Sequence, residues 1–190
     1  MISYTDLTKG ILFIIDGEPW EVLESHFLRM QQRKAVVQTK IKNLMTGKIV
    51  DRNFQPSEFF EEAEMEKIKS RFLYESRGVF WFDELGNPKN RFSFKKEELG
   101  AEAVNFLKPN LEITAFKFKE KIINISLPVK ADFKVVEAPP SIRGDTAQGG
   151  TKSATIETGA KVSVPLFIGE GDIIKVNTQT GDYVERIEKA

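Results

Sequence analysis

The stretch that decides the fold is KSATIETGAKVSVPLFIGEG, residues 152–171, which has the short apolar–polar alternation of paired β-strands. Similar strand-like stretches flank it, FKVVEA at 133–138 and DIIKVNTQTGDYVERI at 172–187. The glycines and prolines that separate such runs are typical of a protein built from many short strands. Residues 129–190 are therefore expected to form a small barrel of about five strands, of the OB type.

A second unit of the same character precedes this one, from residue 65 to residue 128. Its strand-like runs are MEKIKSRFLYES (65–76), VFWF (79–82) and LEITAFKFKEKIINISLP (111–128). The segment KKEELGAEAVNFL, residues 95–107, is the best helix candidate of the chain, because its apolar residues recur at helical spacing. This unit also fits a small OB-type barrel.

The N-terminal unit, residues 1–64, is expected to be a small SH3-like barrel. In its first strand pair the dipeptide Asp16-Gly17 predicts a tight turn, because Asp-Gly readily supplies the positive φ angles that such turns need. A second hairpin has arms at 21–28 and 35–43, and the polar segment MQQRK forms its exposed tip. The whole chain is thus predicted to be all-β, with three consecutive small barrels at 1–64, 65–128 and 129–190.

Phenylalanine is abundant, with fifteen residues in the chain. Pairs such as Phe80 and Phe82, or Phe116 and Phe118, alternate within strands. Alternating rings could form a platform on which RNA bases stack, but this is also the pattern of a barrel core. We expect most of these rings to lie in the core.

Charge is distributed unevenly along a chain of 190 residues whose formal net charge is zero. Residues 26–52 hold seven lysines and arginines against one acid, Asp51, and this excess falls on the second hairpin. A local cationic excess of this kind predicts a phosphate-binding patch. The alternative is that the basic run, like the acidic run at 58–66, is only a solvated face.

Several kinds of catalysis and binding are excluded by the residue types present. The sequence has no cysteine and one histidine, His26, so disulfides, thiolate metal sites, cysteine nucleophiles and histidine triads are excluded. The glycine-rich segment GDTAQGGTKS, residues 144–153, lacks the spacing of a Walker A motif and precedes a strand-like run. Its amides could approach a sugar–phosphate backbone, or it could be an ordinary barrel loop. We expect no enzyme activity, no metal and no cofactor.

Nothing in the sequence predicts export or membrane insertion. The apolar run at 11–15 is too short for the core of a signal peptide. No segment approaches the roughly 20 apolar residues that a membrane span needs. A soluble cytoplasmic protein is expected.

The stretch 152–171 also resembles the signature of bacterial elongation factor P. The residues that match at that family's spacings are Lys152, Ala154, Gly159, Val162, Val164, Pro165, Ile168 and Gly171. Further segments that resemble the family are GDTAQGG (144–150), NTQTGDYVERI (177–187), DGEPWEV (16–22), KNLMTG (42–47) and residues 52–54. The resemblance covers the whole chain and respects its division into three units.

This resemblance implies an architecture, a function and a set of partners. Members of the family have an SH3-like, KOW-type domain followed by two OB domains, in an L-shaped arrangement that is similar to tRNA in outline. They are translation elongation factors that bind both ribosomal subunits between the peptidyl and exit sites, contact peptidyl-tRNA and approach mRNA in the exit site. They promote peptide-bond formation at stalled proline-rich sequences by ordering the reacting tRNA ends, without a catalytic group. A monomer is expected.

The resemblance also implies which residues contact RNA. The hairpin tip that would approach the acceptor end of peptidyl-tRNA consists of Arg29, Met30, Gln31, Gln32, Arg33 and Lys34. The loop that would approach the exit-site codon consists of Arg143, Gly144, Asp145 and Thr146. Tyr183 and Arg186 match a tyrosine and an arginine near the family's C-terminus, as RNA contacts or as a structural pair at a strand end.

The sequence departs from the family at the hairpin tip. Many members have a Pro-Gly-Lys-Gly turn there with a modified lysine, but an ungapped alignment places Gln32 at that position. Glutamine has no nucleophilic amine, so lysine-type extension at Gln32 is chemically excluded. Either the Gln32 amide hydrogen-bonds RNA directly, or Arg33 or Lys34 supplies a cationic contact. We expect an unmodified tip.

Two other functions are alternatives. A paralogue similar to elongation factor P would share the architecture, but the intact GDTAQGG segment at 144–150 argues against it. A general OB-type RNA-binding protein without a ribosomal role would bind free oligonucleotides tightly, with a steep dependence on salt.

Overall fold

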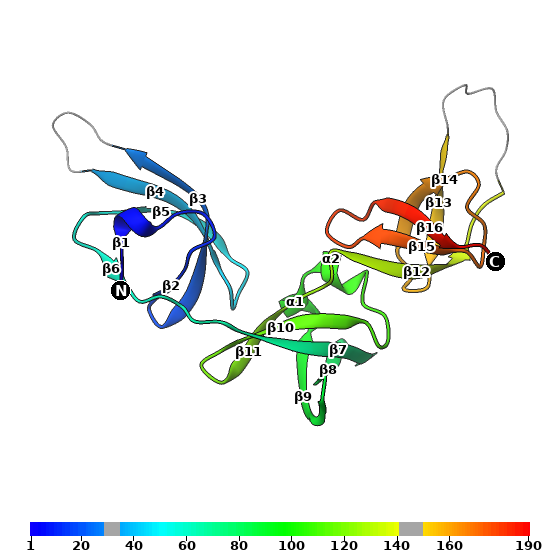
Figure 1. The fold of residues 1–190 in the computed structure, drawn as a ribbon, viewed down its shortest axis with the longest axis horizontal. Helices are drawn as coiled ribbons and strands as arrows, with labels where there is room; N and C mark the ends of the chain where they lie inside the picture. Colours follow the sequence, from blue (N-terminus) through cyan, green and yellow to red (C-terminus); the bar gives the residue numbers. More distant parts are fainter. Residues whose placement is uncertain (29–34, 141–149) are drawn as a thin grey trace. The chain divides into compact units, whose positions relative to one another are not determined.

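The structure, a computed structural model, describes residues 1–28, 35–140 and 150–190 (Figure 1). β-Strands dominate these residues, and the prediction of an all-β fold is confirmed. The helical segments within them are the 3-10 helix η1 (Tyr4–Asp6) and the short α-helices α1 (Lys96–Leu99) and α2 (Ala101–Val104). The described chain divides into two compact units, Met1–Ile68 with Ala115–Asn124, and Lys69–Thr114 with Ile125–Ala190. Each expected domain has a main sheet of its own, and the domain boundaries themselves stay predictions.

The N-terminal sheet is antiparallel, in the order β2-β3-β4-β5, and the short pair β1-β6 lies beside it (Figure 1). Its strands are β1 (Ile2–Ser3), β2 (Leu12–Ile15), β3 (Glu18–Leu28), β4 (Val36–Asn43), β5 (Ile49–Phe54) and β6 (Phe59–Phe60). Asp16 and Gly17 have φ angles of 53° and 81°, so the predicted tight turn between β2 and β3 is confirmed. At the turn from β4 to β5, Gly47 has a φ of 74° and the Asn43 carboxamide accepts hydrogen bonds from two backbone amides.

The side chains on one face of that sheet form much of the core of this first unit. The alternating residues Val37, Thr39 and Ile41 of β4 are buried, as the sequence pattern predicts. Phe13 and Phe54 are fully buried and meet edge to face, with ring centroids 5.8 Å apart. The alternation therefore fixes which face of the second hairpin is apolar and which is polar.

A hairpin from later in the chain also packs in the first unit. It joins β10 (Glu112–Phe118) to β11 (Lys121–Ser126). Phe118 and Ile123 from this hairpin form a buried cluster with Ala63, which explains why residues 115–124 belong to the first unit. Lys117 adds ion pairs with Glu66 at 3.3 Å and with Glu120 at 2.9 Å.

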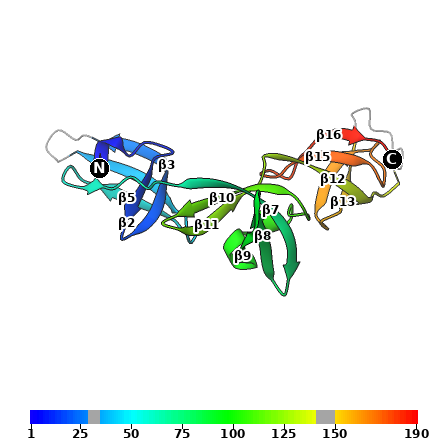
Figure 2. The same ribbon diagram turned by 60° about the horizontal axis from the view of Figure 1, so that its bottom comes forward.

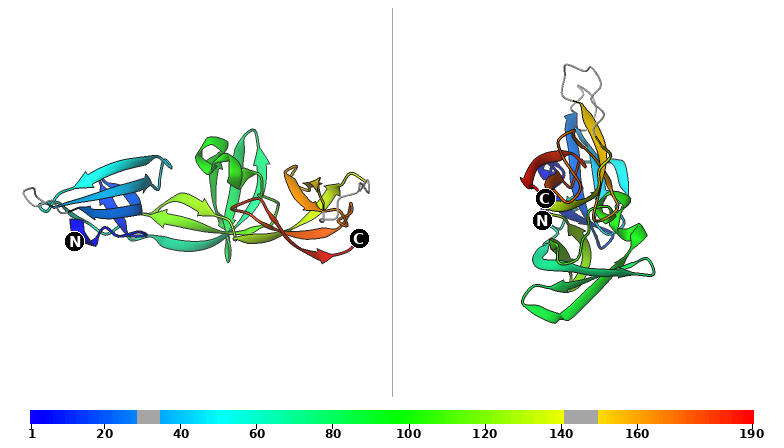
Figure 3. Two further views of the ribbon diagram at one scale, coloured as in Figure 1. Left: turned by 90° about the horizontal axis from the view of Figure 1, so that it is seen from above. Right: turned by 90° about the vertical axis from the view of Figure 1, so that its right-hand side faces the viewer.

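The two remaining sheets share one topology. The central sheet has the order β11-β10-β7-β8-β9, and the C-terminal sheet has the order β14-β13-β12-β15-β16. The other central strands are β7 (Glu66–Ser76), β8 (Val79–Glu84) and β9 (Asn87–Lys95). The C-terminal strands are β12 (Lys130–Glu137), β13 (Thr151–Ile156), β14 (Lys161–Pro165), β15 (Ile173–Asn177) and β16 (Tyr183–Glu188), the last two side by side in Figure 3. Each sheet therefore places its first strand between its second and its fourth, as expected for two OB barrels.

The predicted helix at 95–107 is wrong as a single element. The structure has two helices of four residues each, α1 and α2, separated by Gly100. Gly100 has φ 78° and ψ 148°, a conformation that only glycine adopts readily, and this interrupts the helical hydrogen-bond pattern. The prediction for the phenylalanines is confirmed at Phe80, Phe82 and Phe118, which are buried.

Candidate RNA-binding surfaces

The described part of the second hairpin ends at the pair Leu28–Val36. Strand β5 continues beside β4 as far as the pair Val37–Phe54, within one residue of that end. Three strands therefore support the base of the hairpin tip. The predicted tip residues, at 29–34, lie outside the described residues.

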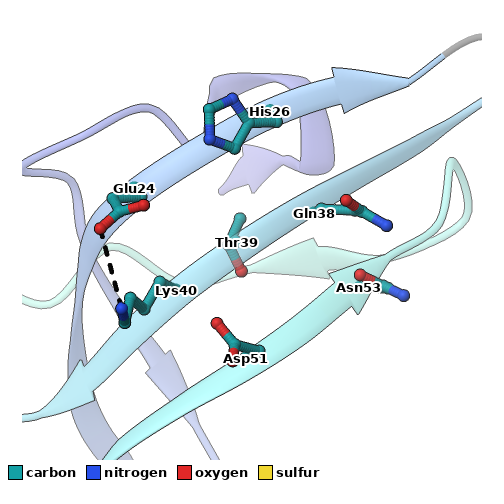
Figure 4. A pocket seen from close by; sticks show the side chains of 7 residues that line it. All are labelled: Glu24, His26, Gln38, Thr39, Lys40, Asp51 and Asn53. Carbon is teal, nitrogen blue, oxygen red and sulfur yellow. Dashed lines mark ion pairs between the residues drawn. The ribbon is translucent and has the colours of Figure 1, made fainter.

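A pocket of about 350 Å³ lies on the polar face of the second hairpin (Figure 4). Its lining residues are Glu24, His26, Gln38, Thr39, Lys40, Asp51 and Asn53. The strand register places Gln38 between His26 and Asn53, three side chains that can each donate and accept hydrogen bonds. Lys40 lies between Glu24 and Asp51, and its ammonium is 3.9 Å from the Glu24 carboxylate. The pocket can therefore make hydrogen bonds in both directions but has no cationic surplus.

The basic residues counted at 26–52 do not gather into one patch within the described part of the chain. Lys40 is next to two acids in the pocket, and Lys42 is paired across the strands with Glu21. Arg52 lies over the ring of Phe54, with 5.2 Å from its guanidinium carbon to the ring centroid. The predicted phosphate-binding patch therefore depends on tip residues that the structure does not describe.

The loop predicted to approach the exit-site codon, residues 143–146, also lies outside the described residues. The segments before and after this loop are joined by a hydrogen bond. The ammonium of Lys152 donates a hydrogen bond to the Pro139 carbonyl at 2.9 Å, which connects β13 with the segment that follows β12. A hydrogen bond therefore connects the described segments that precede and follow residues 141–149.

Arg186 lies on β16, and its side chain contacts an acid and an aromatic ring. Its Nη1 is 3.5 Å from Oδ2 of Asp172, and its guanidinium carbon lies 5.0 Å from the ring centroid of Phe167. Asp172 is buried, which opposes ionisation, but amide hydrogen bonds from Gly169 and Ala190 and the charge of Arg186 outweigh burial and lower its pKa. The side chain of Arg186 is 31% exposed, so the guanidinium is anchored on one side and open on another.

Tyr183 lies three residues before Arg186 on the same strand. It is paired with Val176 of β15, while Arg186 is paired with Ile174. Both partners are buried, so both predicted residues share the side of β16 that faces the barrel core at its rim. The structural pairing at a strand end and an RNA contact are both compatible with this geometry.

Two features of interest were not found from the sequence. One is the pair of residues that contact Arg186, namely Phe167, which is 62% exposed, and Asp172. Arg186 lies far from both in the sequence, so the sequence gives no reason to connect them. An aromatic pair lies on the central sheet, formed by the exposed Tyr74 and the partly buried Trp81, with ring planes 27° apart. The signal for Trp81 was present, because the alternation that buries Phe80 and Phe82 turns the residue between them outward.

Two kinds of feature are absent from the described part of the chain. Among the described residues there is no cluster of three or more His, Cys, Asp or Glu side chains placed to hold a metal ion. Within the same part of the chain, no helix has the length and apolar character to cross a membrane.

Two family models match the sequence. The model for the elongation factor P KOW-like domain matches residues 3–60, and the model for the C-terminal part of elongation factor P matches residues 131–186. Together they include most of the first and third expected domains.

Full-length relatives support the same assignment. A protein named elongation factor P from Caldanaerobacter subterraneus subsp. tengcongensis is 37% identical over 188 residues, covering 98% of this chain and 100% of the relative. One of the same name from Moorella thermoacetica is 38% identical over 186 residues, with the same coverages of 98% and 100%. Among solved structures, translation initiation factor 5A from Methanococcus jannaschii aligns with a TM-score of 0.51 at 14% identity. That alignment covers 66% of this chain and 92% of the other, and it shows similarity of fold.

Proposed function

Since the chain belongs to the elongation factor P family and is thus a translation elongation factor that works with the ribosome, we propose that it binds between the peptidyl and exit sites. There it contacts peptidyl-tRNA and promotes peptide-bond formation where proline-rich sequences stall the ribosome. The observation that carries this proposal is similarity over the full length, at 37% identity across 98% of the chain.

The hairpin of β3 and β4 is the element that we assign to the acceptor end of peptidyl-tRNA. Its arms are paired antiparallel, and β5 supports them almost to the last described pair. A stiff support holds a tip in place at little entropic cost when the protein docks. Ordering the ends of two reacting tRNAs lowers an entropic barrier, so the protein acts by positioning and contributes no catalytic group.

The tip works without the lysine extension that is common in the family. Gln32 occupies the position of that lysine and lacks the amine that such extension needs. The neighbouring Arg33 and Lys34 carry the positive charge of the tip, and we infer that Arg33 supplies the main contact with RNA phosphate. Gln32 adds a neutral hydrogen bond.

The C-terminal barrel makes the second set of contacts. Residues 143–146 approach mRNA in the exit site, and Tyr183 and Arg186 contact RNA backbone. The geometry of Arg186 supports this role, because Asp172 orients the guanidinium while almost a third of the side chain, 31%, stays exposed. A guanidinium that is held in place binds a phosphate with less loss of entropy than a mobile one.

The setting is the cytoplasm, where the protein acts as a monomer. Its partners are both ribosomal subunits, peptidyl-tRNA and mRNA in the exit site. No cofactor takes part, because positioning by hydrogen bonds and charge is sufficient for the proposed effect.

Reconstituted translation of a template with consecutive proline codons tests the proposed function. Adding the protein is expected to reduce the stalled peptidyl-tRNA product and to increase the full-length product. A template with alanine codons in place of the prolines is the control, and its product should not change. Ribosome binding is measured in parallel by co-sedimentation, and intact binding without relief of stalling would remove the proposed function.

A further inference from the structure

Strand β8 has one face in the core and one face turned outward. Phe80 and Phe82 are buried, so Trp81 between them lies on the opposite face. Strands β7, β8 and β9 run side by side (Figure 2), and their residues paired directly across share a face. We call the outward side of these three strands, centred on Trp81, the outer face of the central sheet.

An aromatic pair lies at the centre of this outer face. Tyr74 on β7 is paired directly with Trp81 on β8. Their ring centroids are 6.4 Å apart with an angle of 27° between planes, and Tyr74 is 47% exposed. Trp81 is partly exposed, so both rings are accessible, and nucleic-acid bases stack on accessible rings with little regard to sequence because every base has a π-face.

Cationic side chains lie on both sides of the aromatic pair. On β9, Arg91 and Lys95 are paired with outward positions of β8, and both are exposed. On β7, Lys69 and Arg71 alternate onto the same outer face. The aromatic centre is therefore bordered by groups that bind phosphate.

The outer face has a surplus of positive charge. Among residues 69–95, all of which the structure describes, Asp83 is the acid that the strand register places on this face. Its carboxylate accepts two hydrogen bonds from Arg71, at 2.9 and 2.8 Å. Lys69, Arg91 and Lys95 then remain as excess charge, on a chain whose formal net charge is zero. A polyanion fits this face.

The strand order of the central barrel also favours a nucleic-acid ligand for this face. Strands β7, β8 and β9 are the first three strands of the central OB barrel. OB domains that bind oligonucleotides use the face of their second and third strands, which here are β8 and β9. Trp81, Arg91 and Lys95 are therefore placed where an OB domain receives a single strand.

We propose that the outer face of the central sheet binds an unpaired segment of RNA, with bases stacked on Trp81 and Tyr74 and phosphates held by Lys69, Arg91 and Lys95. This surface is distinct from the hairpin tip and from the loop at 143–146. The proposal goes beyond the proposed function, because it concerns the central barrel and is tested without ribosomes or translation.

The test uses the full-length protein with Trp20→Phe, which leaves Trp81 as its one tryptophan. A short single-stranded RNA of mixed sequence is expected to quench the tryptophan emission, because a stacked base lies against the indole. An abasic oligomer of equal length is expected to bind more weakly and to leave the emission unchanged. If three lysine and arginine contacts form, the logarithm of the affinity falls with that of the salt concentration with a slope of about −2.

Variants in the Trp20→Phe background and a labelled RNA then locate the site. Trp81→Ala is expected to weaken binding by roughly fivefold or more. Trp81→Phe keeps an aromatic ring and is expected to retain most of the parent protein's affinity. Lys69→Gln is expected to weaken binding and to reduce the salt slope by about 0.7. The matched controls are Phe59→Ala and Lys161→Gln, which remove an exposed ring and an exposed lysine elsewhere.

Three results with RNA would overturn the proposal. These are no binding of RNA by the parent protein at low salt, equal binding of the abasic oligomer, and an unchanged affinity in both Trp81→Ala and Lys69→Gln. An acidic peptide that binds as well as RNA would also overturn it, in favour of a protein partner. Circular dichroism shows whether each variant is folded, and if Trp81→Ala does not fold, an unchanged affinity in Lys69→Gln alone would overturn the proposal.

Discussion

Arg71 and Asp83 form a two-point ion pair across β7 and β8. Arg71 donates from Nε to Oδ1 at 2.9 Å and from Nη2 to Oδ2 at 2.8 Å. The Asp83 side chain is 3% exposed and that of Arg71 is 35% exposed, so a buried carboxylate depends on one partly accessible cation. Removing the cation would leave the carboxylate buried without its main partner, which is more costly than losing a surface ion pair.

Arg71→Ala is therefore expected to lower the free energy of unfolding by about 3 kcal/mol, the lower end of the range for a buried pair because Arg71 is partly exposed. Denaturant unfolding of the full-length protein measures the change. The matched control is Lys69→Ala, an exposed residue two positions earlier, which should change stability by about 0.5 kcal/mol or less. Equal effects of the two substitutions would mean that the ion pair contributes little.

The same pair predicts a dependence of stability on pH. The hydrogen bond from Arg71 lowers the pKa of Asp83 below its ordinary value of 3.8 in the folded protein. Its contribution is therefore fully present above pH 3.8 and is lost as the pH falls through the lower folded value. Asp83→Asn should make stability fall less steeply with acid than in the unsubstituted protein. Asp172, whose pKa is also lowered, stays in both proteins, so parallel acid curves would contradict the role of Asp83.

Much of the fold could be predicted because its signals are local. Asp16-Gly17 specifies a turn by its own φ preferences, and the alternation of Phe80 and Phe82 specifies a buried face. The break at Gly100 could not be predicted, since helical spacing of apolar residues says nothing about the backbone angles between them. The partners of Arg186 could not be predicted for a different reason, because Phe167 and Asp172 lie in the segment between β14 and β15 and contact Arg186 only once β15 and β16 have paired.

Gly100 gives a direct test of that break. Its φ of 78° and ψ of 148° are strained for any residue with a Cβ, so Gly100→Ala is expected to cost about 1–3 kcal/mol. Gly169→Ala is the control, because Gly169 is not at positive φ and a Cβ there would make only an ordinary contact, 4.0 Å from Asp172. Denaturant unfolding compares the two. A stabilised Gly100→Ala variant would indicate that residues 95–107 can form one helix after all.

Arg186 can be tested for its two roles separately. Arg186→Lys keeps the charge but loses the guanidinium that lies over the Phe167 ring, so it should cost roughly 1 kcal/mol of stability and largely retain relief of proline stalling. Arg186→Ala should lower both the free energy of unfolding and the relief of proline stalling. The two readouts are denaturant unfolding and reconstituted translation at a temperature where the variants are folded. Full relief by Arg186→Ala would assign Arg186 to structure and not to RNA.

The tip of the second hairpin is the last test, and it concerns chemistry more than stability. Mass spectrometry of a peptide that covers residues 29–34 from the native source is expected to give the mass of the unmodified sequence. An added mass on this peptide, other than oxidation of Met30, would contradict an unmodified tip, and fragment ions would show whether it lies on Arg29, Arg33 or Lys34.

With an unmodified tip, the guanidinium of Arg33 is expected to matter more than the amide of Gln32. A hydrogen bond to a charged group is worth about 1.5–3 kcal/mol, against about 0.5–1.5 kcal/mol for a neutral one. Arg33→Ala should therefore reduce relief of proline stalling more than Gln32→Ala does, in the same translation assay. Lys48→Ala, an exposed lysine in the turn between β4 and β5, serves as the control for loss of positive charge. A larger loss in Gln32→Ala would instead make the amide of Gln32 the group that contacts tRNA.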